Sequence, residues 1–172
     1  CYNDVTGYTN PDESEYDCFT VGHTSTSVSL ATGLAQGRDL LSGKENIVAI
    51  IGDGSLSGGL AFEGFNNASV LDSNLIIVIN DNQMSIDENK GGFYRTLKEL
   101  RETHGQSSNN IFKAMGFEYR YLDEGNDLKS VIELFESVKD VDHPVVLHVN
   151  TLKGKGYEPA EKHKMEFHWH TP

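Results

Sequence analysis

Short, unbroken apolar runs alternate along the chain with segments whose apolar residues recur at helical spacing. The runs NIVAII (46–51), LIIVI (75–79) and PVVLHV (144–149) are rich in β-branched residues and show no polar alternation. Such runs are typical of strands that are buried on both faces, as in parallel sheets. One more strand is predicted at 117–121. Helical spacing is found over residues 25–37, 60–68, 93–103, 109–115 and 128–138.

The alternation of strands and helices predicts the fold class. We expect an α/β protein with a doubly wound, mainly parallel sheet and helices on both of its faces. Each strand–helix–strand passage should form a right-handed βαβ unit. The polar residues 1–17 predict an extended or loop lead-in, and residues 151–172 predict a loop-rich tail. Residues 1–172 are therefore expected to form a single domain.

The charge balance restricts the classes of partner. The 172 residues include 26 Asp and Glu against 14 Lys and Arg, which gives a formal net charge of −12. Nucleic acids and anionic membranes bind basic faces, so neither is an expected partner. Two cysteines, Cys1 and Cys18, are too few for a disulfide framework and indicate a reducing, cytoplasmic location. A polyanionic ligand would need backbone amides, a helix N-terminus or a metal ion to hold it.

A glycine-rich turn that contains one carboxylate follows the first predicted strand. The turn is GDGSLSGG (52–59), and it leads into the next helix. Glycines allow close backbone approach, and a helix N-terminus offers unpaired N–H groups to a phosphate. A dinucleotide site would use these glycines, with Asp81 on a ribose. However, Asp53 would repel a pyrophosphate unless a cation lay between them. A P-loop is disfavoured because no Lys-Ser/Thr pair follows the glycines.

Asp53 is instead well suited to a divalent cation of the Mg²⁺ kind. Such cations take oxygen ligands and are usually completed by phosphates of the ligand. The loop NDNQM (80–84) follows the next predicted strand and offers an amide oxygen and a backbone carbonyl. Adjacent parallel strands run about 4.8 Å apart, so the loops at their carboxyl ends can share one ion. Ordinary turn chemistry would also use Asp81 and Asn82, and the residues alone leave that alternative open.

Four separated stretches resemble thiamine diphosphate enzymes of the 1-deoxy-D-xylulose-5-phosphate synthase family. They are GHTSTS (22–27), GDGSLSGG (52–59), NDNQMSI (80–86) and KGKGYEPAE (153–161), in the same order as in the family. The second and third stretches together contain the GDG…N pattern that binds the metal in such enzymes. The resemblance extends from about residue 13 onward. It implies the thiamine diphosphate-binding fold of the diphosphate-binding type.

The resemblance implies a role for each matching residue. The Mg²⁺ ligands would be Asp53, Asn82 and the carbonyl of Met84. Thiamine diphosphate would be bound by Gly22, His23, Thr24, Asp53, Gly54, Ser55, Asn82 and Tyr157. His23 and His168 would be the catalytic histidines, able to donate hydrogen bonds or relay protons. Their alternatives are a backbone hydrogen bond that holds the loop of His23 and a simple surface position for His168. The other histidines receive no role: His104, His143, His148, His163 and His170.

By resemblance, the chain is part of a transferase that decarboxylates pyruvate. The whole enzyme would condense the two-carbon unit with glyceraldehyde 3-phosphate and so make 1-deoxy-D-xylulose 5-phosphate for isoprenoid, thiamine and pyridoxal biosynthesis. Its cofactors would be thiamine diphosphate and Mg²⁺. Its protein partners would be a pyrimidine-binding domain, from the same or a partner chain, and a second copy in a homodimer. The pyrimidine-binding and C-terminal domains are missing from residues 1–172, so the chain alone is expected to be inactive.

The chain departs from the family pattern at two internal places. The segment between Met84 and Phe117 is shorter than in typical synthases, and EGFN (63–66) stands where EALN is more usual. Three alternatives therefore stay open. The chain could belong to a transketolase-like or split enzyme, act as a non-catalytic module, or bind a dinucleotide.

Overall fold

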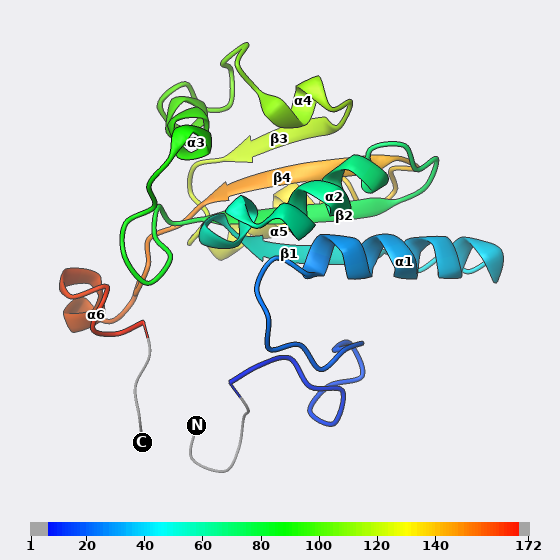
Figure 1. Ribbon diagram of the computed structural model, residues 1–172, viewed down its shortest axis with the longest axis horizontal. Coiled ribbons are helices and arrows are strands. Elements are labelled where there is room, and N and C mark those ends of the chain that lie inside the picture. The colour runs from blue at the N-terminus through cyan, green and yellow to red at the C-terminus, as the bar shows by residue number, and fades with distance from the viewer. Residues whose placement is uncertain (1–6, 169–172) are drawn as a thin grey trace.

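A computed structural model describes residues 7–168 of the chain; residues 1–6 of the expected lead-in and 169–172 of the expected tail lie outside the described residues. Four strands form one parallel sheet in the order β1-β2-β4-β3 (Figure 1). Their bounds are β1 (Val48–Gly52), β2 (Leu75–Asp81), β3 (Glu118–Leu122) and β4 (Pro144–Asn150). The four predicted strands and their parallel arrangement are confirmed.

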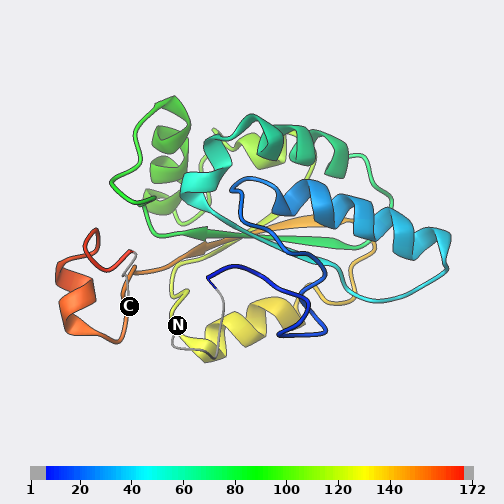
Figure 2. The same ribbon diagram turned by 60° about the horizontal axis from the view of Figure 1, so that its bottom comes forward.

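Helices cover both faces of the sheet, as Figure 2 shows most clearly. On one face lie α1 (Ser27–Leu40), α2 (Gly59–Ala68), α3 (Gly92–Glu102) and α4 (Ile111–Ala114). On the other face lies α5 (Leu128–Glu136). The expected doubly wound α/β fold is therefore confirmed. A short helix, α6 (Glu158–Lys162), lies beyond the carboxyl end of β4, in the tail that was expected to be loop-rich (Figure 1).

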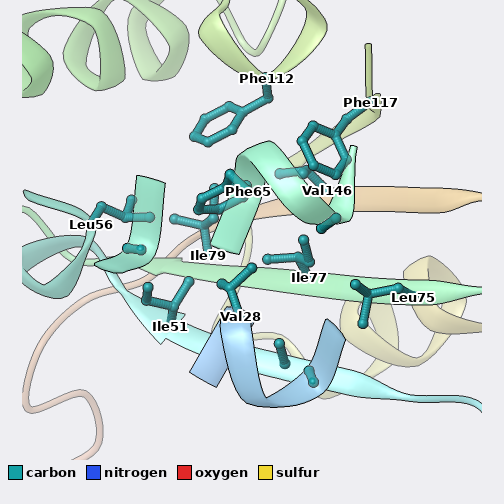
Figure 3. Close-up of a cluster of buried hydrophobic side chains, with 14 of the residues drawn as sticks. Val28, Ile51, Leu56, Phe65, Leu75, Ile77, Ile79, Phe112, Phe117 and Val146 are labelled. Atoms are coloured by element: carbon teal, nitrogen blue, oxygen red, sulfur yellow. The ribbon is translucent and has the colours of Figure 1, made fainter. Parts of the chain in front are cut away.

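The main hydrophobic core lies between the sheet and the helices α1 to α4. In Figure 3, Phe65 of α2 packs above the strand residues Ile77 and Ile79. The Phe65 ring centroid is 5.5 Å from that of Phe112 and 5.8 Å from that of Phe117. A smaller core on the opposite face joins β2 and β4 to α5 and the residues after it: Ile76, Val78, Val138, Val145, Leu147 and Val149.

Local sequence signals set several element boundaries. The Asp127 carboxylate accepts a hydrogen bond from the Ser130 amide at 2.8 Å and so caps the N-terminus of α5. The Asn110 side chain caps α4 in the same way. The glycine turn after β1 becomes a short 3₁₀ helix, η1 (Asp53–Ser57), before α2 begins. This 3₁₀ turn was not anticipated.

The expectation that the first strand is buried on both faces is wrong. Ala49 and Ile51 of β1 are buried under α1, but Val48 and Ile50 are 42% and 66% exposed on the opposite face. The sheet order explains the difference, because β1 is an edge strand while β2 and β4 lie in the middle. An apolar run reports a tendency toward burial and cannot reveal which strands are its neighbours.

Two further observations on the described part of the chain concern membrane-spanning helices and cysteines. Among residues 7–168, no helix has the length and apolar character needed to span a bilayer. Cys18 is an exposed free thiol, while Cys1 lies outside the described residues.

Candidate functional site

The loops that follow β1, β2 and β4 meet at one edge of the sheet, where the carboxyl ends of the strands lie (Figure 1). The Thr151 hydroxyl, just after β4, donates a hydrogen bond to the Asn80 side-chain oxygen at 2.6 Å. The Thr151 amide bonds the Asp81 carbonyl at 2.9 Å. In open α/β sheets this edge is where ligands bind. The sequence motifs lie at these carboxyl ends for one of two reasons. Each motif either directly follows a parallel strand or packs against a loop that follows one.

Asp53 begins η1 immediately after β1, and it is only 1% exposed. Its Oδ1 accepts a hydrogen bond from the Gly54 amide at 2.9 Å, and its Oδ2 accepts one from the Asn89 side-chain amide at 2.8 Å. Burial raises the pKa of Asp53 to about 7, and the nearby charge of Asp81 adds to the rise. Two buried carboxylates repel each other, so either a proton or a cation at Asp53 is stabilised.

The turn after β2 presents the other predicted metal donors. The Gln83 amide donates to Asp81 Oδ1 at 3.1 Å, and the Met84 amide donates to Asn82 Oδ1 at 3.2 Å. These are two consecutive Asx turns. They place Gln83 in the left-handed region, with φ of 69°. Asp53, Asn82 and Met84 line one cavity of about 1060 Å³, which extends to α3 and to the residues after α6.

The donor set at this cavity fits Mg²⁺. A carboxylate, an amide oxygen and a backbone carbonyl are the hard ligands that this ion takes, and phosphates of a ligand commonly complete its shell. Asp53 and Asn82 each accept N–H groups but keep further lone pairs, since a carboxylate has about four acceptor sites. Within residues 7–168 no cluster of three or more His, Cys, Asp or Glu side chains could hold a metal. A mixed donor set such as this one does not depend on such a cluster.

The turn with Gly22, His23 and Thr24 packs directly against η1. Ser25, with φ of 70°, donates from its hydroxyl to the Ser55 carbonyl at 2.7 Å. His23, Thr24 and Ser55 line a second cavity of about 650 Å³, beside the one that contains Asp53. His23 Nδ1 lies 2.6 Å from the Thr24 carbonyl oxygen, so the histidine does hold its own loop by a backbone hydrogen bond. Gly22 is exposed next to it.

Tyr157 is the N-cap residue of α6, and its side chain is exposed. Its ring lies edge-on to Phe167, with the centroids 5.6 Å apart. Tyr157 and Asn82 line a third cavity of about 460 Å³. The predicted cofactor residues other than Gly22 and Gly54 thus line three neighbouring cavities, two of which share Asn82.

His168 lines none of these three cavities. Its Nδ1 is 2.8 Å from the Lys153 ammonium, which also donates to the Ser85 carbonyl. Burial lowers the pKa of His168, and the charge of Lys153 lowers it further. His168 is exposed, as the surface alternative expects, but it is linked through Lys153 to the loop that carries the metal donors.

Sequence reasoning missed two residues at or near the site. Asn89 donates to Asp53, and Lys153 lies close enough for its ammonium to feel the charge of Asp53. Lys153 belongs to the KGKGYEPAE stretch, which is a usable signal, although it was given no role. Asn89 sits in a polar loop with no distinguishing pattern, and it reaches the site because the loop folds back over η1.

Asp81 does not occupy the position that a dinucleotide site requires. Its side chain is wholly buried, and its Oδ2 accepts hydrogen bonds from Arg101 and His148. A carboxylate that binds a ribose must be open to the ligand. The structure therefore does not offer Asp81 to a ribose.

Comparison with protein families adds the deciding observation. Residues 1–108 and 101–151 match the family profile described as 1-deoxy-D-xylulose-5-phosphate synthase. The chain belongs to the 1-deoxy-D-xylulose-5-phosphate synthase family. The resemblance inferred from the four stretches is thereby confirmed.

Individual synthases of the family match almost the whole chain. The 1-deoxy-D-xylulose-5-phosphate synthase of Porphyromonas gingivalis is 39% identical, with 98% of this chain and 32% of the relative covered. Synthase 1 of Geobacter sulfurreducens is 38% identical, with 97% and 32% covered, and the synthase of Clostridium botulinum strain Alaska E43 is 36% identical, with 97% and 33% covered. The chain thus spans about a third of the length of these curated relatives.

The alignments also locate an internal difference from the synthase relatives. The match to the Porphyromonas protein runs over 205 residues, more than the 172 of this chain, so the relative has residues that this chain lacks. The two parts of the family match overlap at residues 101–108, which begin within the last turn of α3. This agrees with the expected shortening of the segment between Met84 and Phe117.

A solved structure supports the fold. An X-ray structure described as that of a thiamin diphosphate-dependent enzyme isolated from Mycobacterium smegmatis superposes with a TM-score of 0.56 over 76% of this chain and 22% of that chain. The sequences are 19% identical, so this likeness concerns the fold alone. The parallel α/β sheet is consistent with the thiamine diphosphate-binding fold that the resemblance implied.

Proposed function

We propose that this chain is the diphosphate-binding part of a thiamine diphosphate-dependent synthase. The whole enzyme decarboxylates pyruvate and joins the two-carbon unit to glyceraldehyde 3-phosphate, giving 1-deoxy-D-xylulose 5-phosphate. One observation carries the proposal: Asp53, Asn82 and Met84 line one cavity at the carboxyl ends of β1 and β2, in a chain of the synthase family.

In this proposal each loop at the sheet edge has its own task. Asp53, the Asn82 side chain and the Met84 carbonyl hold Mg²⁺, which neutralises the repulsion around Asp53 and binds the diphosphate. Gly54 and Ser55 contact the diphosphate near the start of α2. Gly22, His23, Thr24 and Tyr157 bind the remainder of the cofactor. His23 and Thr24 line one neighbouring cavity, with Gly22 next to them in the chain, and Tyr157 lines the other.

When bound, thiamine diphosphate supplies carbanion chemistry at a carbonyl carbon. The protein must hold that cofactor and manage protons around it. His23 and His168 are the proposed catalytic histidines, each able to donate a hydrogen bond to a developing oxyanion or to relay a proton. Lys153 keeps His168 near the metal loop. A pyrimidine-binding domain, from the same or a partner chain of a homodimer, completes the site.

Calorimetric titration of the chain with thiamine diphosphate tests this proposal. We expect binding heat in the presence of Mg²⁺ and none when EDTA removes the metal. Asp53→Asn should abolish the heat because it removes the only carboxylate among the proposed donors. Glu88→Gln is the matched control, since Glu88 lines the same cavity but is exposed and outside the donor set.

The opposing results of this titration are equally specific. Thiamine diphosphate binding that survives EDTA would contradict the metal bridge. Titration with NAD in parallel covers the dinucleotide alternative, which predicts metal-independent heat. Silence with both ligands would leave the family membership intact but exclude a cofactor site in this chain.

A further inference from the structure

A buried polar network lies directly behind the proposed metal site. Asp81 and His148 are both 0% exposed. Asp81 Oδ2 accepts hydrogen bonds from the Arg101 guanidinium and from His148 Nε2, the latter at 2.8 Å. His148 Nδ1 pairs with the Tyr119 hydroxyl at 2.7 Å. The four side chains come from β2, α3, β4 and β3, so the network joins four separate elements.

Stability alone does not account for this network. Taking charged groups out of water costs free energy, and buried ion pairs are often replaceable by apolar residues without loss of stability. His148 lies opposite Ile79 of β2 and Tyr121 of β3 in the sheet register, and apart from it only the last residue of β4, Asn150, is polar. A leucine would pack there at lower cost. The network is therefore better explained by what it holds in place.

The group held in place is the turn that carries the metal donors. The second oxygen of Asp81, Oδ1, accepts the hydrogen bond from the Gln83 amide. Gln83 has a left-handed φ of 69°, which is unfavourable for a non-glycine residue and needs outside support. If the Asp81 carboxylate rotates, Gln83 loses its acceptor and the adjacent Asn82 loses its orientation.

We propose that Arg101, His148 and Tyr119 are positioning residues that act through Asp81. By holding Oδ2 of that carboxylate in place, they fix the direction of Oδ1, and so set the turn 82–84 so that its oxygen donors face Mg²⁺. This inference rests on the proposed function, because it assigns the network to the same metal site. It also concerns residues to which sequence reasoning gave no role in the chemistry.

The direction of each hydrogen bond supports this assignment. An ionised carboxylate only accepts, so His148 Nε2 must carry the hydrogen that bonds Asp81. Burial raises the pKa of Tyr119 well above its usual range, so its hydroxyl keeps a proton to donate to Nδ1. Tyr119 thus selects the ring tautomer that holds Asp81, in the way that outer partners orient the ligands of metal sites.

Positioning and plain electrostatics predict opposite effects on metal affinity. Arg101 pairs with Asp81 and lines the same cavity as the proposed metal donors. Its positive charge alone would therefore disfavour binding of a metal cation there. Removal of that charge in Arg101→Met should tighten metal binding if only electrostatics matter. If Arg101 positions Asp81, the same substitution should weaken metal binding.

The experiment measures Mn²⁺ binding to the full 172-residue chain by electron paramagnetic resonance. We expect Arg101→Met, His148→Leu and Tyr119→Phe each to weaken binding by about tenfold or more, the usual effect of losing an outer partner. Arg101→Lys should recover part of the loss. Arg120→Met is the matched control, because Arg120 is next to Tyr119 on β3 but bonds Glu118 and Ser137 rather than Asp81. Far-ultraviolet circular dichroism verifies the fold of each variant.

A second measurement keeps the inference separate from the proposed function. Amide hydrogen exchange of the metal-free chain, followed by NMR, should speed up at Gln83 and Met84 in Arg101→Met and Tyr119→Phe but not in Arg120→Met. Should the unaltered chain fail to bind Mn²⁺, the proposed function is wrong and the exchange rates alone decide the positioning role. Unchanged exchange at these two amides, or tighter Mn²⁺ binding by Arg101→Met, overturns the positioning role. Tyr119→Phe decides the question if Arg101→Met does not fold.

Discussion

At the residue scale, Gly54 occupies a position that leaves no room for a side chain. A Cβ there would lie 2.6 Å from Ser85 Cβ and 3.1 Å from Ser85 Cα. The contact joins η1 to the loop after β2, the two segments that carry the proposed metal donors. Glycine is therefore required by close approach, as the glycine-rich turn indicated, whereas its neighbour Gly52 has nothing within 4 Å of the corresponding point.

Gly54→Ala is expected to lower the free energy of unfolding by about 1–3 kcal/mol, the usual cost of overpacking. The new methyl group must push Ser85 and its loop away from η1. Gly52→Ala is the matched control and should change stability by less than about 0.5 kcal/mol. Urea unfolding followed by circular dichroism measures both. Equal effects of the two substitutions would refute the steric argument.

Residues differ in how far the sequence exposes their role. Asp53 could be singled out as a candidate metal ligand because a carboxylate inside a glycine turn is chemically out of place unless a cation is near. His148 could not, because a histidine inside an apolar run carries no pattern of its own. Its partners Asp81, Tyr119 and Arg101 are distant in sequence, and only the parallel pairing of β2, β4 and β3 brings them together.

At the scale of elements, a histidine–carboxylate pair joins β3 to β4 near the start of both strands. His143 Nε2 lies 2.7 Å from Glu118 Oε2, and His143 Nδ1 lies 3.1 Å from Asp142 Oδ1. These hydrogen bonds, Glu118 first, raise the pKa of His143 above its usual 6.5. The hydrogen bond from His143 is also the largest cause that lowers the pKa of Glu118, so this carboxylate stays ionised near neutral pH.

The stability of this strand pair should depend on pH in one direction. Because the pKa of His143 is higher in the folded than in the unfolded state, the protonated histidine stabilises the fold. This stabilisation is complete at a pH below the unfolded-state pKa, and it is lost as the pH rises through the folded-state pKa. The thermal unfolding temperature should therefore decrease as the pH is raised from about 6 to about 8. In His143→Gln this part of the fall should vanish. Parallel curves for the two proteins would contradict the assignment.

Element types were predictable, but their neighbours were not. The three apolar runs became strands because continuous β-branched stretches favour burial in a parallel sheet. Their order in the sheet depends on which helices pack where, and β1 consequently lies at the edge. The helix α6 escaped notice because Glu158–Lys162 is too short for a periodic pattern.

At the scale of the whole molecule, the main core between the sheet and the helices α1 to α4 joins residues from both halves of the chain. Phe65 of α2, 3% exposed, packs against aromatic rings from Phe112 and Phe117, which precede β3. The same core includes Val146 of β4 (Figure 3). Loss of one large side chain here should therefore weaken the molecule as a unit.

Phe65→Ala is expected to lower the free energy of unfolding by about 3–5 kcal/mol, because it removes buried surface and leaves a cavity. Ile50→Ala serves as the comparison: it also removes apolar surface, but Ile50 is 66% exposed and the change should stay near 0.5 kcal/mol or less. Chemical unfolding with two spectroscopic probes measures both. A small effect for Phe65→Ala would mean that the layer of α1 to α4 unfolds independently of the sheet.

The sequence by itself determined the class of fold, the strands and most helices, and the family. These follow from local periodicity and from short motifs, which need no knowledge of distant contacts. Tertiary structure alone decided the edge position of β1, the hydrogen bond of Asn89 to Asp53 and the position of Lys153 within reach of the Asp53 charge. It also decided the network of Arg101, His148 and Tyr119 around Asp81. The physical reason is that these features depend on which strands pair and which loops fold back, and such pairings join residues that no local pattern connects.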